Sequence, residues 1–223
     1  MIKIPSPSTA HAEQALALTY APASAKPALA ALFALDQMLG KIVRTTREPM
    51  VGQMRLTWWY EALLKLDKAA PPAEPVLQAL YATVVPAGVS GPELAAMIDG
   101  WDALLDPPLD AVALERFAAE RGERLFAAAA HLLAVEDRRI AVAGRGWALA
   151  DLSLRLSDPV SRAAARERAA IALEQALTGR WPSRSRALGA LAVSARFDVV
   201  PRALPEGSPK RVARLAWHRL TGY

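Results

Sequence analysis

Three aspartates at helical spacing are the residues best suited to hold a metal ion. Asp99, Asp102 and Asp106 stand at i, i+3 and i+7, so on a helix they share one face. Carboxylates gathered in this way can bind Mg²⁺, which prefers oxygen ligands. The three residues are therefore the candidate metal ligands. The plainer interpretation is a solvated helix face beside the Pro107-Pro108 turn, and we prefer it.

A second group of candidates could line a substrate cavity. It comprises Asp36, Arg55, Trp58, Trp59 and Glu61. Adjacent helical residues point about 100° apart, so at most one of the two tryptophans can face a given pocket, and the other belongs to the core. Arg55 could hold a phosphate through a bidentate contact, or it could form an ion pair with Asp36, which is the preferred interpretation.

No residue is a confident catalytic candidate. The three histidines, His11, His131 and His218, lie far apart in the chain, which also lacks a G-x-S-x-G elbow, a Walker lysine loop and a G-x-G-x-x-G fingerprint. Gly144-Arg145-Gly146 predicts only an interruption or hinge in a helix.

The elements that must position these residues are helices. The 223 residues are 53% hydrophobic and rich in Ala and Leu, which favours helix and suffices for one core over residues 1–223. Prolines and capping residues divide the chain into segments, and Ser90 with Glu93 has capping-box spacing. We expect an all-α, single-domain antiparallel bundle. Its helices should cover residues 8–20, 27–44, 49–68, 73–83, 91–106, 110–135, 136–157, 158–177, 183–196 and 208–221.

Charge divides the chain into two halves. Up to Asp137 there are 11 Lys/Arg and 16 Asp/Glu, a net charge of −5, and from Arg138 onward there are 16 and 6, a net charge of +10. We expect no nucleic-acid partner, because no helix-turn-helix, zinc or RNP-type signature accompanies the basic half. Cysteine is absent, which fits a reducing compartment. No secretory signal and no spanning segment are recognised, so a cytoplasmic location is expected.

The last helix, 208–221, is basic. Val212, Leu215, Ala216 and Leu220 can share one face, and Lys210, Arg211, Arg214 and His218 can line another. This pattern suits a helix lying on an anionic membrane surface. It also suits an amphipathic helix docked on the bundle, which is preferred.

Three segments, in order, resemble the squalene/phytoene synthase family. Residues 49–63, PMVGQMRLTWWYEAL, resemble the family pattern P–G–RL–WW–EAL, and Met97-Ile98-Asp99-Gly100 resembles its MIxG helix. Residues 117–128 stand where the family has YCxxVAGxxG. The resemblance is strongest over 27–133. It implies the isoprenoid synthase fold, and in active members a Mg²⁺-dependent reaction of prenyl diphosphates between two D-x-x-x-D motifs on facing helices.

Both aspartate motifs are incomplete. In the first, only Asp36 remains, and position 40 is glycine. In the second, Asp151 and Asp158 stand seven apart, and Arg155, one turn from Asp151, would compete with a metal. The resemblance therefore supports the fold but not diphosphate ionisation, and it places the chain near the family's complex I assembly factors.

Three functions remain open. The first is a catalytically degraded family member that uses no cofactor and binds a protein partner, such as a respiratory-complex assembly client, peripherally on the inner face of a membrane. The second is an active Mg²⁺-dependent prenyltransferase in which Asp36, Asp99, Asp102 and Asp106 hold the metal and Arg55 holds diphosphate. The third is a module that binds a prenyl lipid in a hollow interior without chemistry.

Overall fold

A computed structural model describes residues 10–105, 109–200 and 204–223, and over these ranges the chain is helical. It confirms the all-α class. The helices include α1 (Ala10–Leu18), α2 (Lys26–Thr45), α3 (Pro49–Leu64), α4 (Pro75–Thr83), α9 (Arg139–Arg155), α10 (Pro159–Ala176), α11 (Arg186–Val199) and α12 (Pro209–Thr221). Between α4 and α9 lie α5 (Gly91–Ala96), α6 (Ile98–Asp102), α7 (Ala111–Phe117), the π-helical η3 (Ala118–Glu123) and α8 (Arg124–Leu132).

The predicted punctuation explains most helix ends. Ser90 and Glu93 form the expected capping box, in which the Ser90 amide donates to the Glu93 carboxylate at 2.8 Å. Asp110 accepts from the amide of Ala113, and Asp158 accepts from that of Ser161. Proline follows the N-cap of α3, α4, α10 and α12, where its missing N–H costs nothing.

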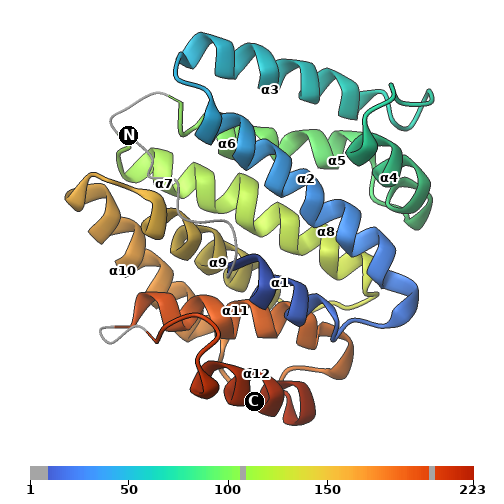
Figure 1. Ribbon diagram of the computed structural model, residues 1–223. Coiled ribbons are helices and arrows are strands. Elements are labelled where there is room, and N and C mark those ends of the chain that lie inside the picture. Colours follow the sequence, from blue (N-terminus) through green and yellow to red (C-terminus); the bar gives the residue numbers. More distant parts are fainter. Residues whose placement is uncertain (1–9, 106–108, 201–203) are drawn as a thin grey trace.

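Helix α9 lies at the centre of the arrangement. It packs against α8, η3, α10 and α11, and α8 in turn contacts α2. Figure 1 shows α3 along one edge of the molecule and α12 at the opposite edge. No described helix is both long enough and apolar enough to cross a bilayer.

The expected interruption of α9 at Gly144 and Gly146 does not occur, because both residues lie within the unbroken helix. Gly144 instead permits a close approach to η3. A Cβ on Gly144 would lie 2.2 Å from the carbonyl oxygen of Gly122, and a Cβ on Gly122 would lie 2.3 Å from that of Gly144. The small residues therefore set the distance between two helices and do not mark a hinge.

Helix α12 docks on the bundle, but through other side chains than its sequence pattern suggests. Arg211 and His218, assigned to the polar outer face, are buried together with Leu215. Val212 and Leu220, assigned to the apolar inner face, are 44% and 73% exposed. The difference arises because buried carboxylates on α1 and α11 neutralise Arg211, which a sequence pattern within α12 cannot show.

The close contact between η3 and α9 can be tested with Gly144→Ala. The added methyl group would overlap backbone atoms that cannot move aside, so the variant should lose about 1–3 kcal/mol or more of unfolding free energy in urea denaturation. The matched control is Gly52→Ala on α3, where a Cβ would meet side-chain atoms and no backbone, the nearest being Leu105 Cδ2 at 3.0 Å. Equal losses in the two variants would contradict the role assigned to the pair of glycines.

Candidate functional site

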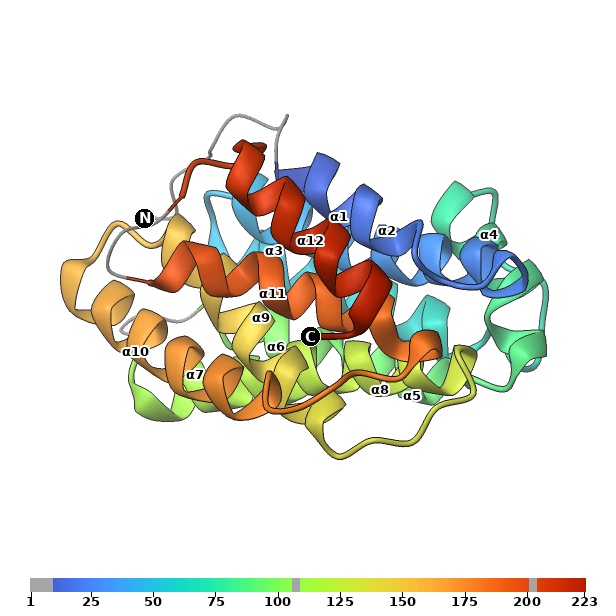
Figure 2. The ribbon, with the colours of Figure 1, turned by 90° about the horizontal axis from the view of Figure 1, so that it is seen from below.

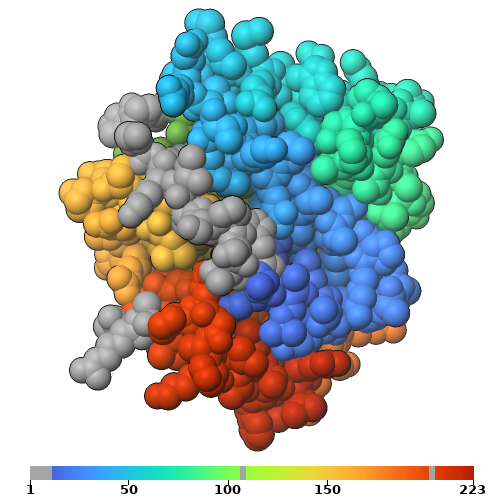
Figure 3. All heavy atoms as spheres, viewed as in Figure 1, coloured from blue at the N-terminus to red at the C-terminus, as the bar shows by residue number. Residues whose placement is uncertain are grey.

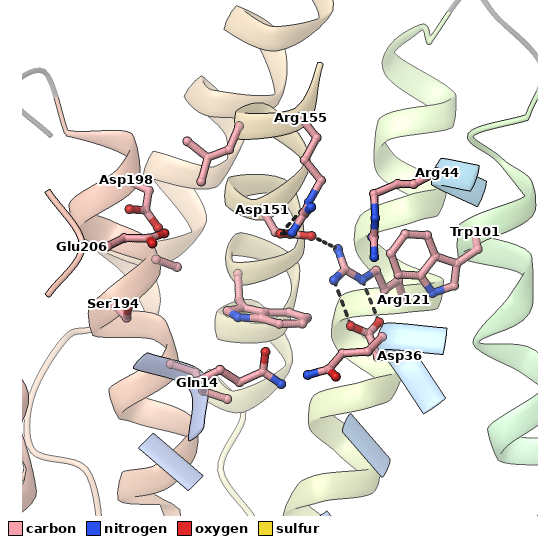
Figure 4. Close-up of a pocket in the computed structure, with 15 residues that line it drawn as sticks. Gln14, Asp36, Arg44, Trp101, Arg121, Asp151, Arg155, Ser194, Asp198 and Glu206 are labelled. Carbon is pink, nitrogen blue, oxygen red and sulfur yellow. Dashed lines mark hydrogen bonds and ion pairs between the residues drawn. The ribbon is translucent and has the colours of Figure 1, made fainter. Parts of the chain in front are cut away.

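The polar centre of the bundle is the side chain of Arg121. It projects from η3 and is 3% exposed. Its Nε and Nη2 atoms donate to Asp36 Oδ1 and Oδ2 of α2 at 2.8 and 2.9 Å, and its Nη1 donates to Asp151 Oδ2 of α9 at 2.8 Å. One guanidinium therefore links carboxylates that come from two different helices (Figure 4).

Three aromatic rings enclose this guanidinium. Its carbon lies 4.3 Å from the ring centre of Trp101, 4.7 Å from that of Trp147 and 5.2 Å from that of Phe117. Cation–π attraction of this kind is strongest when water is excluded. The rings thus stabilise the cation and close the surroundings against solvent.

The Asp151 carboxylate also accepts hydrogen bonds from a second arginine. Arg155, one turn further along α9, donates from Nε and Nη2 to Asp151 Oδ1 at 2.9 and 2.6 Å. Burial would raise the pKa of the Asp151 carboxyl, but Arg121 and Arg155 outweigh it and hold the pKa well below its usual range. Burial would likewise lower the pKa of Arg121, which its two carboxylate partners raise instead. The Asp151 carboxylate and the Arg121 guanidinium are therefore both charged at neutral pH.

The face of α2 that carries Asp36 continues with no further acid. Gly40 and Arg44 follow at i+4 and i+8, and Arg44 points toward the same cluster in Figure 4. A Cβ on Gly40 would lie 2.5 Å from Arg44 Nη1 and 2.7 Å from the Trp101 ring. Burial, followed by repulsion from Arg155, lowers the pKa of Arg44. The space that a second carboxylate would need is thus filled by an indole and a cation.

The cavity beside this cluster is small. Its volume is about 80 Å³, whereas cavities that enclose small organic ligands usually measure about 300–1,000 Å³. Besides the residues of the cluster, its lining includes Ser194 and Asp198 of α11 and Glu206, which lie opposite the arginines in Figure 4.

The structure separates most of the candidates expected to meet in a cavity. Arg55, Trp58 and Glu61 lie on the exposed side of α3, away from Asp36. Arg55 Nη1 donates to Thr46 Oγ1 at 3.1 Å, and it is Arg121 that occupies both oxygens of Asp36. Trp59 is 5% exposed and belongs to the hydrophobic core. The predicted Arg55–Asp36 ion pair is therefore absent.

The acidic group on α6 lies outside the cluster. Arg116 Nη2 is 3.8 Å from an Asp99 oxygen and 4.0 Å from an Asp102 oxygen, with all three side chains well exposed. Asp106 lies outside the described residues. Among the residues that are described, no three His, Cys, Asp or Glu side chains are arranged to hold a metal ion.

Arg121 was missed at the level of sequence, although a signal was present. Phe117, Arg121 and Leu125 follow one another at spacings of four. An arginine on the apolar row of an amphipathic helix must find buried carboxylates, or it would be destabilising.

These observations place the molecule in a known family. A family model described as squalene/phytoene synthase matches residues 9–177. The chain belongs to the squalene/phytoene synthase family. The match extends beyond the segment of strongest resemblance and includes Asp36, Arg121 and Asp151. No curated protein and no solved structure matched the chain.

Replacing Arg121 should destabilise the folded protein. In Arg121→Gln, two carboxylates lose their shared partner inside the bundle, so the unfolding free energy should fall by about 3–5 kcal/mol in urea denaturation. Arg55→Gln removes the same charge from an exposed position and should cost at most about 1 kcal/mol. Similar losses for the two variants would contradict a buried neutralising role for Arg121.

The depressed pKa of Asp151 predicts an acid-dependent loss of stability. Because the folded state holds this pKa below the unfolded value of about 3.9, protons bind first to the unfolded chain as the pH falls. The Asp151 contribution is therefore present above about pH 4 and is lost as the pH falls through the folded pKa. Thermal unfolding at a series of pH values should show a shallower acid slope for Asp151→Asn, and parallel slopes would contradict the assignment.

Proposed function

We propose that this member of the squalene/phytoene synthase family is not a catalyst and acts by binding a protein partner, peripherally at a membrane. The observation that carries the proposal is the Arg121 guanidinium bound to both Asp36 and Asp151. These aspartates are what remains of the acidic motifs on two facing helices. A cation built into the protein now neutralises them.

The chemistry of diphosphate ionisation supports this reading. A diphosphate leaving group needs Mg²⁺ held by carboxylate oxygens. Both Asp36 oxygens accept from Arg121, and both Asp151 oxygens accept from Arg121 or Arg155. A Mg²⁺ ion would have to displace a guanidinium that cannot give up its proton. The pairing therefore weighs against a metal in this cluster.

The alternative enzyme, with a rearranged metal site, has less support. Asp99 and Asp102 lie on the exposed side of α6 near Arg116. Asp36, the fourth member of that set, is committed to Arg121. Neither Arg55 nor Trp58 lines the cavity in which the substrate would react.

A prenyl lipid held inside the bundle also has little support. The cavity beside Arg121 measures only about 80 Å³ and includes several charged side chains in its lining, whereas a prenyl chain needs a larger, apolar space. Binding at the outer surface is favoured instead.

Helix α3 supports a binding role. Met50, Met54 and Trp58 stand at i, i+4 and i+8 and are 73%, 67% and 46% exposed. They lie opposite the buried row that contains Leu56 and Trp59. An apolar row of this kind on the surface is characteristic of proteins that bind partners.

Calorimetry with a long-chain prenyl diphosphate, with and without Mg²⁺, tests the loss of the metal site. We expect no Mg²⁺-dependent binding, and an active squalene/phytoene synthase measured in parallel provides the positive control. Mg²⁺-dependent binding by this protein would overturn the proposal and favour the enzyme. In that case, the alternative metal site has its own test. The double variant Asp99→Asn with Asp102→Asn should abolish turnover of the prenyl diphosphate.

A separate experiment tests the proposal that the protein partner is a client in the assembly of respiratory complex I. A deletion strain should contain less assembled complex I, measured by its activity in isolated membranes. Normal respiration with full complex I would exclude this client and leave other protein partners.

A further inference from the structure

Helix α12 is attached to the bundle by its polar side. Arg211, Leu215 and His218 are at most 1% exposed and face inward. Arg211 Nη2 donates to Glu13 of α1 at 2.5 Å, and its Nη1 donates to Asp198 of α11 at 2.6 Å. Helix α12 is therefore held to the bundle by the buried ion pairs of Arg211 together with the buried side chain of Leu215.

Docking through these positions turns the apolar side of α12 outward. The buried residues stand at i, i+4 and i+7, so positions 213, 216, 217 and 220 fall on the opposite side of the helix. Ala213 and Ala216 are exposed, Trp217 is 57% exposed and Leu220 is 73% exposed. Figure 2 shows α12 on the outside of the bundle, and in Figure 3 its residues form one end of the molecular surface.

Cations flank this outward apolar row, and acids are absent from it. Lys210, Arg214 and Arg219 are exposed along the helix, and residues 207–223 contain no Asp or Glu. Arg214 Nη1 donates to a main-chain oxygen of Tyr223, the last residue of the sequence, so the positive charge offered to a partner comes from Lys210 and Arg219. Arg211, the other arginine of the segment, is neutralised internally.

We propose that the outward face of α12 binds the surface of an anionic lipid bilayer, with Trp217 and Leu220 inserted among the headgroups. Helices that lie in a membrane interface combine large apolar side chains, often tryptophan, with flanking Lys and Arg. Phospholipid headgroups supply negative charge opposite the exposed side chains of Lys210 and Arg219. A second copy of the chain on this face would bring like charges together, which opposes self-association.

This surface lies outside the residues that the family model matches, which end at 177, so it is a property of this chain and not of the matched region. It deepens the proposed function by naming where the protein meets the membrane. The internal cluster around Arg211 fixes the helix before binding, so no ordering of α12 needs to accompany insertion.

Co-sedimentation with vesicles tests the proposal. The full chain should bind vesicles of equal parts phosphatidylcholine and phosphatidylglycerol and bind pure phosphatidylcholine weakly. Trp217→Ser with Leu220→Ser should weaken binding to the anionic vesicles about tenfold or more. Lys210→Gln with Arg219→Gln should weaken it about fivefold per charge and reduce its dependence on salt.

The matched control is Val160→Ser with Ile171→Ser on α10. These residues are 77% and 52% exposed, so the control removes a similar exposed apolar pair from the same basic half of the chain. It should bind as the unaltered protein does. All variants change outward-facing side chains, and unchanged thermal unfolding checks that α12 remains docked.

Three results would overturn the proposal. They are no binding of the unaltered protein to anionic vesicles, full binding by the Trp217/Leu220 variant, or a solution dimer that this variant dissociates. None of them bears on Mg²⁺-dependent diphosphate binding, so failure here is distinguishable from failure of the non-catalytic assignment.

Discussion

A guanidinium group keeps its proton inside a protein, and Arg121 therefore requires negative partners wherever the fold buries it. Asp36 from α2 and Asp151 from α9 supply them, and three aromatic rings shield the group from water. This requirement fixes the spacing of α2, η3 and α9. The close backbone contact between Gly122 and Gly144 brings Arg121 within reach of both acids. The site and the packing of the bundle centre thus have one cause.

The same constraint acts a second time at the C-terminal edge of the molecule. Arg211 is buried and paired with Glu13 and Asp198, which joins α12 to α1 and α11. Because these carboxylates attract the basic side of α12 inward, Trp217 and Leu220 face solvent. One buried ion-pair cluster joins α2, η3 and α9, and the other turns an apolar surface outward.

Sequence patterns were informative wherever the controlling interaction is local. Ser90 with Glu93, Asp110 and Asp158 act as caps within three residues of their partners, and the Ser90–Glu93 capping box was predicted correctly. Arg155 pairs with Asp151 one turn away, as the spacing indicated. Patterns failed where the partner is distant in the chain. Arg121 and Asp36 are separated by 85 positions, and a single sequence cannot show which distant residues meet.

By itself, the sequence determined the all-helical class and the helix boundaries to within a few residues. These follow from composition, proline placement and short-range spacing. Tertiary structure decided which arginine neutralises Asp36, that Trp58 faces outward while Trp59 is buried, and which side of α12 meets the bundle. These depend on how helices distant in sequence pack together. The free energy of burying a charge is set by partners on other helices, and helical periodicity alone does not contain that information.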